Sequence, residues 1–211
     1  MTPRLRGLAV VAIGSAVLLT GCGSVPDLNP GIAARVGDET ISDSTVRDVA
    51  ADYCPAVTPQ LQGQAIPRSQ LNARVAGSLA LRSAADQFAA DQGVEAGPSY
   101  QEAVDQAEAG GQFEGLSDAE KDAAIDVSGA ELYVSAVVDA AGDDGAALFQ
   151  QWLDDHDVRI NPRYGVELDG GRAVPTDTSV SFAVSDNATR ASGDEPDTTY
   201  AATLPETQRC G

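Results

Sequence analysis

The sequence predicts a mainly α-helical domain closed by a small β-sheet. Apolar residues recur at helical spacing through much of the region from residue 42 to residue 154. Two short β-prone runs precede this region, and a third follows it at 158–160. Because a single hairpin is barely stable alone, we expect the late strand to join the early pair in one sheet.

The N-terminal hairpin is predicted by runs at 34–36 and 40–41 that flank the turn signal Gly37-Asp38. Ser42 is a suitable N-cap for the first helix. The apolar face of this helix consists of Val46, Val49, Ala50, Tyr53 and Cys54. Pro55 should end it, because proline disfavours helical backbone in the residue before it.

Four more helices are expected from their start and stop signals. Pro67 and Gly93 suit the two ends of a second helix, and a third runs from 98 to about 109. Ser117 to Glu120 is a capping box for a fourth helix ending near Gly142, and Asp143 can cap a fifth. The residues expected to face inward are Leu71, Val75, Leu79, Phe88, Ile125, Gly129, Leu132, Ala136, Leu148, Phe149, Trp152 and Leu153.

The last segment, 166–211, has a different composition. It is rich in Thr, Asp, Ser and Gly, and only 180–184 alternates like a strand. Such a composition predicts a polar, acidic and poorly structured tail.

A secretory signal is predicted at the start of the chain. Arg4 and Arg6 precede an apolar run at 8–19, which is too short to span a bilayer. The run ends in Leu-Thr-Gly-Cys at 19–22, which resembles the lipobox of bacterial lipoproteins. This resemblance implies a signal peptide at 1–21, lipid on Cys22, and a tether at 22–31.

The implied location is the extracytoplasmic face of a bacterial cell membrane, where lipid on Cys22 would hold the protein. One lysine among 13 basic residues, in an Ala/Gly/Asp-rich chain, is typical of high-GC bacteria such as actinobacteria. Disulfides persist in that compartment. We therefore expect Cys54 and Cys210 to pair and to tie the tail to the first helix; the alternative is two free thiols.

Two segments resemble the SurA/PrsA/trigger-factor type of chaperone module. In the first, at 33–49, the matching residues are Ala34, Val36, Gly37, Ile41, Ser42 and Val46. The second, at 158–165, resembles the returning strand of the module, so the resemblance covers roughly 32–165. Isomerases of this type add a parvulin domain of about 100 residues, whereas 46 residues follow Gly165. The expectation is the binding module without isomerase activity.

The resemblance implies binding of unfolded or newly exported polypeptides to a partly apolar surface between helices. The candidate contact residues are Tyr100, Phe113, Phe88 and Tyr133. Tyr100 and Phe113 lie in polar, glycine-flanked stretches, which favours their exposure. The alternative function is a scaffold or partner-binding envelope lipoprotein with no chaperone role.

Other function classes have little support in the sequence. A net charge of −19 argues against nucleic-acid binding, which needs basic patches. We expect neither a cofactor nor a metal site, because the glycines lack phosphate-loop spacing and the cysteines lack zinc spacing. His156 is the single histidine, and no Gly-x-Ser-x-Gly motif accompanies it. We therefore expect no catalytic residues; a hydrolase using His156 is the weakest alternative.

Overall fold

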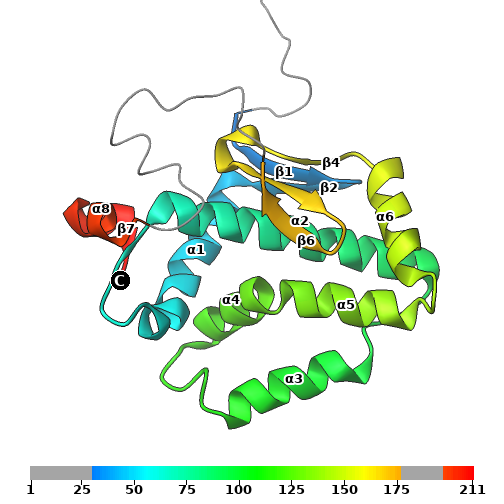
Figure 1. The fold of residues 1–211 in the computed structure, drawn as a ribbon, viewed down its shortest axis with the longest axis horizontal. Coiled ribbons are helices and arrows are strands. Elements are labelled where there is room, and N and C mark those ends of the chain that lie inside the picture. Colours follow the sequence, from blue (N-terminus) through cyan, green and yellow to red (C-terminus); the bar gives the residue numbers. More distant parts are fainter. Residues whose placement is uncertain (1–29, 177–196) are drawn as a thin grey trace, which may run out of the picture.

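The computed structural model describes residues 30–176 and 197–211 (Figure 1). The predicted signal peptide at 1–21, Cys22, nearly all of the tether and the strand at 180–184 lie outside the described residues.

The predicted mainly α fold with a small sheet is confirmed. The N-terminal half consists of β1 (Ile32–Val36), β2 (Glu39–Ser42), α1 (Asp43–Val57), the 3₁₀-helix η1 (Thr58–Leu61), β3 (Ile66–Pro67), α2 (Arg68–Gln92) and α3 (Pro98–Ala109). The remaining elements are α4 (Asp118–Ser128), α5 (Ala130–Ala140), α6 (Gly145–Asp155), β4 (Val158–Ile160), η2 (Pro162–Tyr164), β5 (Val166–Asp169), β6 (Arg172–Pro175), α8 (Thr198–Thr203), η3 (Glu206–Gln208) and β7 (Arg209–Cys210).

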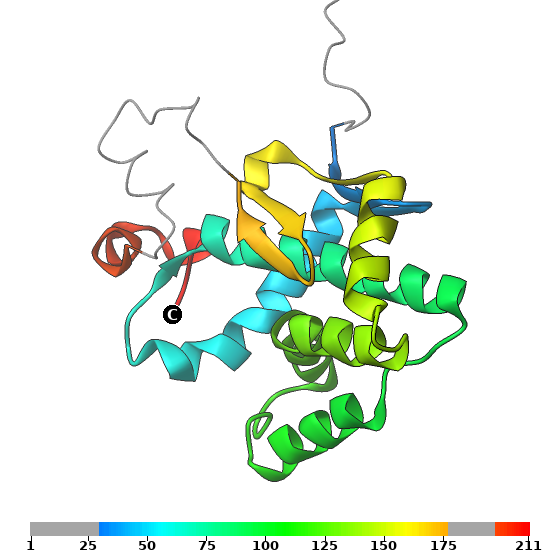
Figure 2. The same ribbon diagram turned by 45° about the vertical axis from the view of Figure 1, so that its right-hand side comes forward.

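Helix α2 is the central element of the fold. The sheet and the β5–β6 hairpin lie on one side of it; α4 and α5 lie on the other, with α3 outermost (Figures 1 and 2). Of the 12 buried residues in α2, eight are alanine, serine or glycine. These small side chains let neighbouring elements approach the helix from several directions. For example, a Cβ on Gly77 would lie 2.6 Å from the Cβ of Ala173 in the hairpin.

The predicted three-stranded sheet is present, in the order β2-β1-β4 and fully antiparallel. Ala34 pairs with Ile41 on one side and with Ile160 on the other. Gly37 adopts a φ of +52° in the turn, as the turn signal predicted. Gln87 of α2 donates a hydrogen bond to the Val36 carbonyl, which holds the sheet to the central helix.

Two helix boundaries differ from the sequence prediction. Helix α1 continues past Pro55 to Val57. Proline removes one helical hydrogen bond, but this loss falls in the last turn, where the Thr58 N–H still bonds to the Cys54 carbonyl. The single helix predicted from Ser117 to Gly142 is divided into α4 and α5 at Gly129, whose Cβ would lie 2.5 Å from the Ile125 carbonyl oxygen.

Two leucines that were predicted to face the core are exposed. Leu132 is 42% exposed, because the break at Gly129 starts a new helix whose buried face is formed by other residues. Leu148 is 37% exposed, since α6 buries the stripe of Phe149, Trp152 and Leu153. These two leucines are the exposed large hydrophobic residues of the described chain.

The described parts of the tail contain more structure than its composition predicts. Strands β5 and β6 form a hairpin that packs on α2, and β7 pairs with β3 through Ile66–Cys210 and Pro67–Arg209. Cys54 and Cys210 form a disulfide with a Cα–Cα distance of 5.7 Å, and Cys210 is buried. The disulfide and the strand pairing together fasten the end of the tail to α1 and to the start of α2.

We predict that the double variant Cys54→Ser/Cys210→Ser has a lower free energy of unfolding by about 3–5 kcal/mol in urea denaturation. The disulfide closes a loop between residues 156 positions apart, and long loops lose the most unfolded-state entropy on cross-linking. Cys22→Ser is the matched control and should leave the stability unchanged. Two reactive thiols at positions 54 and 210 in the denatured, unreduced protein would contradict the prediction.

Candidate functional site

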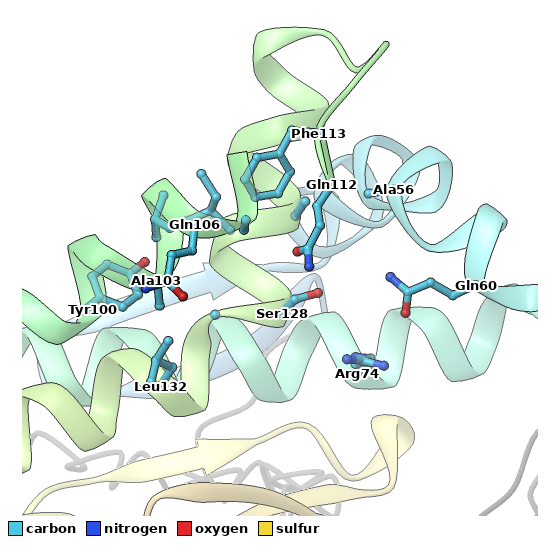
Figure 3. Close-up of a pocket in the computed structure, with 15 residues that line it drawn as sticks. Ala56, Gln60, Arg74, Tyr100, Ala103, Gln106, Gln112, Phe113, Ser128 and Leu132 are labelled. Atoms are coloured by element: carbon cyan, nitrogen blue, oxygen red, sulfur yellow. The ribbon is translucent and has the colours of Figure 1, made fainter. Parts of the chain in front are cut away.

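A cavity of about 590 Å³ lies between α3 and the rest of the helical body. Its apolar wall includes Val104, Phe113, Ile125 and Leu132. Figure 3 shows Tyr100 and Leu132 toward one end, with Gln60 and Arg74 toward the other and Ser128 between them. The volume lies in the range of about 300–1,000 Å³ that is typical of ligand sites in proteins.

The cavity exists because small residues line both α3 and α4. Ala103 and Ala107 of α3 face a wall that includes Ala124 and Gly129. Short side chains at these positions leave the space between the helices unfilled. Tyr100 is the one buried residue of α3, so this helix contributes little to the core.

Helix α3 is held at its N-terminal end by a cluster around Arg82. The Arg82 guanidinium of α2 donates a hydrogen bond of 2.6 Å to the Tyr100 hydroxyl. It also lies 4.2 Å from the ring centroid of Tyr133 in α5 and 3.6 Å from an Asp126 carboxylate oxygen in α4. The rings of Tyr100 and Tyr133 pack edge to face, with centroids 5.0 Å apart. Arg82 therefore joins four helices through one side chain.

The cluster also changes two acid–base equilibria. Burial raises the pKa of Tyr133 to about 12, and the hydrogen bond that its hydroxyl donates to Asp86 adds to this effect. Burial likewise raises the pKa of the Asp126 carboxyl, although the positive charge of Arg82 opposes that change.

The four candidate contact residues occupy three different environments. Tyr100 and Phe113 line the cavity, but Tyr100 is buried rather than exposed as predicted, because α3 turns it toward Arg82. Tyr133 is half-buried in the Arg82 cluster. Phe88 is fully buried and packs edge to face on Phe149, with ring centroids 5.2 Å apart. Phe88 is therefore a core residue and offers no surface to a partner.

Sequence reasoning did not find several residues that line the cavity. Gln60, Arg74 and Gln112 are polar positions with no distinguishing pattern, and Ile125 and Leu132 were predicted to fill the core. No local signal identifies the first three. Gly129 was a signal that Ile125 and Leu132 need not share one buried face, because the helix breaks at that glycine.

The charge inside the cavity is opposite to the charge around it. Residues 98–131, which include α3 and α4, contain nine acidic residues and one lysine. None of these carboxylates is among the 15 residues that line the cavity, and Arg74 is the single charged residue among them. The cavity thus combines apolar side chains, amide groups and one cation within an acidic surface.

His156 lies away from the cavity, at the end of α6. Its ring stacks on Trp152 with centroids 4.0 Å apart, and its Nδ1 lies 2.8 Å from the Trp152 carbonyl oxygen. The Trp152 indole donates a hydrogen bond to Asp91. These contacts give His156 a place in the packing of α6 against α2, and they assign it no chemical step.

Residues 30–176 and 197–211 contain neither a metal-binding cluster nor a membrane-spanning helix. No group of three or more His, Cys, Asp or Glu side chains in these residues could hold a metal ion. None of the helices there is both long enough and apolar enough to cross a bilayer.

Comparison of the chain with protein-family models, with curated proteins and with solved structures found no match.

We predict that Tyr133 ionises at a pH of about 12, which a difference titration of phenolate absorbance between the wild type and Tyr133→Phe can measure. The pKa is raised above the value of about 10 for an unfolded tyrosine, so the folded state keeps the proton longer. The stabilisation is complete below pH 10 and is lost as the pH rises toward 12. The wild type should therefore lose more stability across this window than Tyr133→Phe; equal losses would contradict the assignment.

Proposed function

We propose that this chain is a lipid-anchored extracytoplasmic protein that binds unfolded or newly exported polypeptides and has no isomerase or other catalytic activity. The observation that carries the proposal is the cavity beneath α3, which presents apolar and amide side chains within a strongly acidic surface. The proposed binding site is the cavity itself, and its wall includes Tyr100 and Phe113.

The lining of the cavity suits a polypeptide. Phe113, Ile125 and Leu132 offer apolar contacts for side chains. Gln60 and Gln112 carry amide groups that can both donate and accept hydrogen bonds, as the peptide backbone requires. Binding by a few apolar contacts and amides is compatible with clients of varied sequence, because neither group demands a single partner geometry.

Access to the cavity is compatible with movement of α3. This helix buries only Tyr100, so moving it away exposes less apolar surface than moving α2, which buries 12 residues. The segment after α3 contains Gly111 and Gly115 at φ of +75° and +81°, a backbone conformation that glycine adopts without strain.

The order of the elements is compatible with the SurA/PrsA-type resemblance. Strand β4 returns after six helices to pair with β1, which is the arrangement that the resemblance implies. The matched residues Ala34, Val36 and Val46 are all fully buried, as structural positions of a shared module would be. The rival proposal, a partner-binding envelope lipoprotein, requires one fitted partner in the same cavity instead of many clients.

We predict that Leu132→Asp abolishes most of the suppression of client aggregation by the full chain reconstituted in lipid nanodiscs. The substitution places a charge at the apolar end of the cavity, and Leu132 is exposed enough for the fold to tolerate it. Leu148→Asp is the matched control, because Leu148 has similar exposure on α6 and does not line the cavity.

The proposal is wrong if the wild type suppresses no aggregation at stoichiometric excess, or if both leucine variants lose activity equally. Capture of one tight partner together with no suppression would favour the rival function. Hydrolysis that His156→Ala abolishes would favour the enzyme alternative.

We predict that Cys22→Ser releases the protein from the membrane fraction and prevents labelling by radioactive palmitate. Two or more acyl chains on one cysteine give stable anchoring, whereas the acidic chain has no electrostatic attraction to anionic lipid. Cys54→Ser is the control and should remain in the membrane. If the Cys22→Ser protein keeps both its membrane association and its palmitate label, the prediction that lipid is attached to Cys22 is wrong.

A further inference from the structure

We propose that the cavity beneath α3 recognises the C-terminal end of a polypeptide, with Arg74 binding the terminal carboxylate and the last apolar side chains lying against Phe113 and Leu132. This inference rests on the proposed polypeptide binding and adds the part of the client that is bound. The juxtaposition of one cation with an apolar wall in a carboxylate-free cavity is the observation behind it.

Arg74 has no carboxylate partner within 4 Å among the described residues, although the chain has 32 acidic and 13 basic residues. Arg82, Lys121 and Arg163 do form such pairs, with Asp126, Glu108 and Asp43 respectively. Arg47 of α1, like Arg74, has none among the described residues, but it lies outside the cavity. The Arg74 guanidinium lies over the ring of Tyr53, with its central carbon 5.7 Å from the ring centroid. Arg74 is exposed at the edge of the cavity, so its guanidinium is available to an anion from outside.

Neutral donors accompany Arg74 at the same end of the cavity. Gln60 lies beside Arg74, and the side chain of Gln112 extends from the opposite wall toward Ser128 (Figure 3). Ser128 also lines this part, and its hydroxyl shares a hydrogen bond of 2.9 Å with that of Tyr53. A carboxylate accepts hydrogen bonds only, so an arginine fork with amide and hydroxyl donors around it matches its needs.

The residues at the opposite end of the cavity indicate the polarity of the rest of the ligand. Leu132 and Tyr100 lie there, away from Arg74 (Figure 3). A ligand that spans the cavity thus has an anionic end and an apolar body. With the proposed polypeptide binding, such a ligand is the end of a peptide chain.

The size of the cavity favours a chain end over an internal segment. A volume of about 590 Å³ accommodates only a few residues. An internal segment has no terminal carboxylate for Arg74, whereas a chain end carries one and enters beside the acidic surface of 98–131. The same acidic surface favours lysine or arginine a few residues before the end of the client, because opposite charges attract.

Three labelled peptides test the inference by fluorescence anisotropy with the full chain in nanodiscs. All begin with lysines and continue with leucines; one ends in a free carboxylate, the second in an amide, and the third in glutamate with a terminal amide. The free acid should bind about tenfold more tightly than the plain amide, because the amide removes the charge that Arg74 contacts. The third peptide carries a side-chain carboxylate and should bind no better than the second.

Two arginine variants test whether the difference in binding between the acid and amide peptides depends on Arg74. Arg74→Gln should remove most of the difference between acid and amide while keeping a polar side chain of similar length. Arg47→Gln makes the same charge change at an exposed position of α1 outside the cavity, and it should preserve the difference. Leu132→Asp should weaken the acid and the amide.

Equal binding of acid and amide by the wild type would overturn the inference, as would equal effects of the two arginine variants. Tight binding of the glutamate peptide would also overturn it, because it would show that a side-chain carboxylate suffices and that the chain end is not recognised specifically. If all three peptides bind equally and Leu132→Asp weakens all of them, polypeptide binding stands and only carboxylate recognition fails. If none binds, both proposals fail together.

Discussion

Helix α2 can be surrounded by other elements because most of its buried residues are small. Alanine, serine and glycine on several of its faces let the sheet, the β5–β6 hairpin and helices α4 and α5 approach it closely. Each alanine buries little apolar area, so stability depends on many close contacts and few large side chains. Larger residues support the ends of the helix, where Phe88 packs on Phe149 and Leu71 is fully buried.

This mode of packing has a consequence for α3. The space on α2 is already occupied by α1, α4 and α5, so α3 lies outside them and meets the core mainly through Tyr100. Arg82 reaches from α2 to the Tyr100 hydroxyl and thereby joins the outer helix to the central one. A helix fixed near one end over alanine-rich neighbours leaves a cavity, and the functional proposals for this protein depend on that space.

The location of charge follows from the same arrangement. Five of the seven acidic residues of α3 and α4 are exposed, where their carboxylates stay hydrated, whereas Asp126 is partly buried beside Arg82. The lining of the cavity comes from other faces of these helices, from α1, η1, α5 and the segment after α3, and from α2, which contributes Arg74. An acidic surface on α3 and α4 and a cation at one end of the cavity can therefore coexist within one small region.

Much of the fold could be predicted from the sequence because its signals are local. The turn at Gly37, the caps at Ser42 and Ser117 and the helical spacing of apolar residues each act within a few positions of the chain. The Cys54–Cys210 pair was predictable for another reason: the lipobox resemblance implies lipid on Cys22, which would leave two cysteines to pair. The end of α1 was predicted wrongly, because one lost hydrogen bond in a last turn is tolerated.

The sequence by itself determined most of the helices, the hairpin and its late third strand. Only the tertiary structure decided which residues line the cavity. Arg74 and Gln60 come from elements separated in the sequence from α3 and α4, and their nearness depends on how the helices pack. The break at Gly129 likewise decides that Leu132 faces outward, because the phase of a helix is reset where its hydrogen bonding is interrupted. Burial of a helix face depends on its neighbours in space, and local spacing carries no information about them.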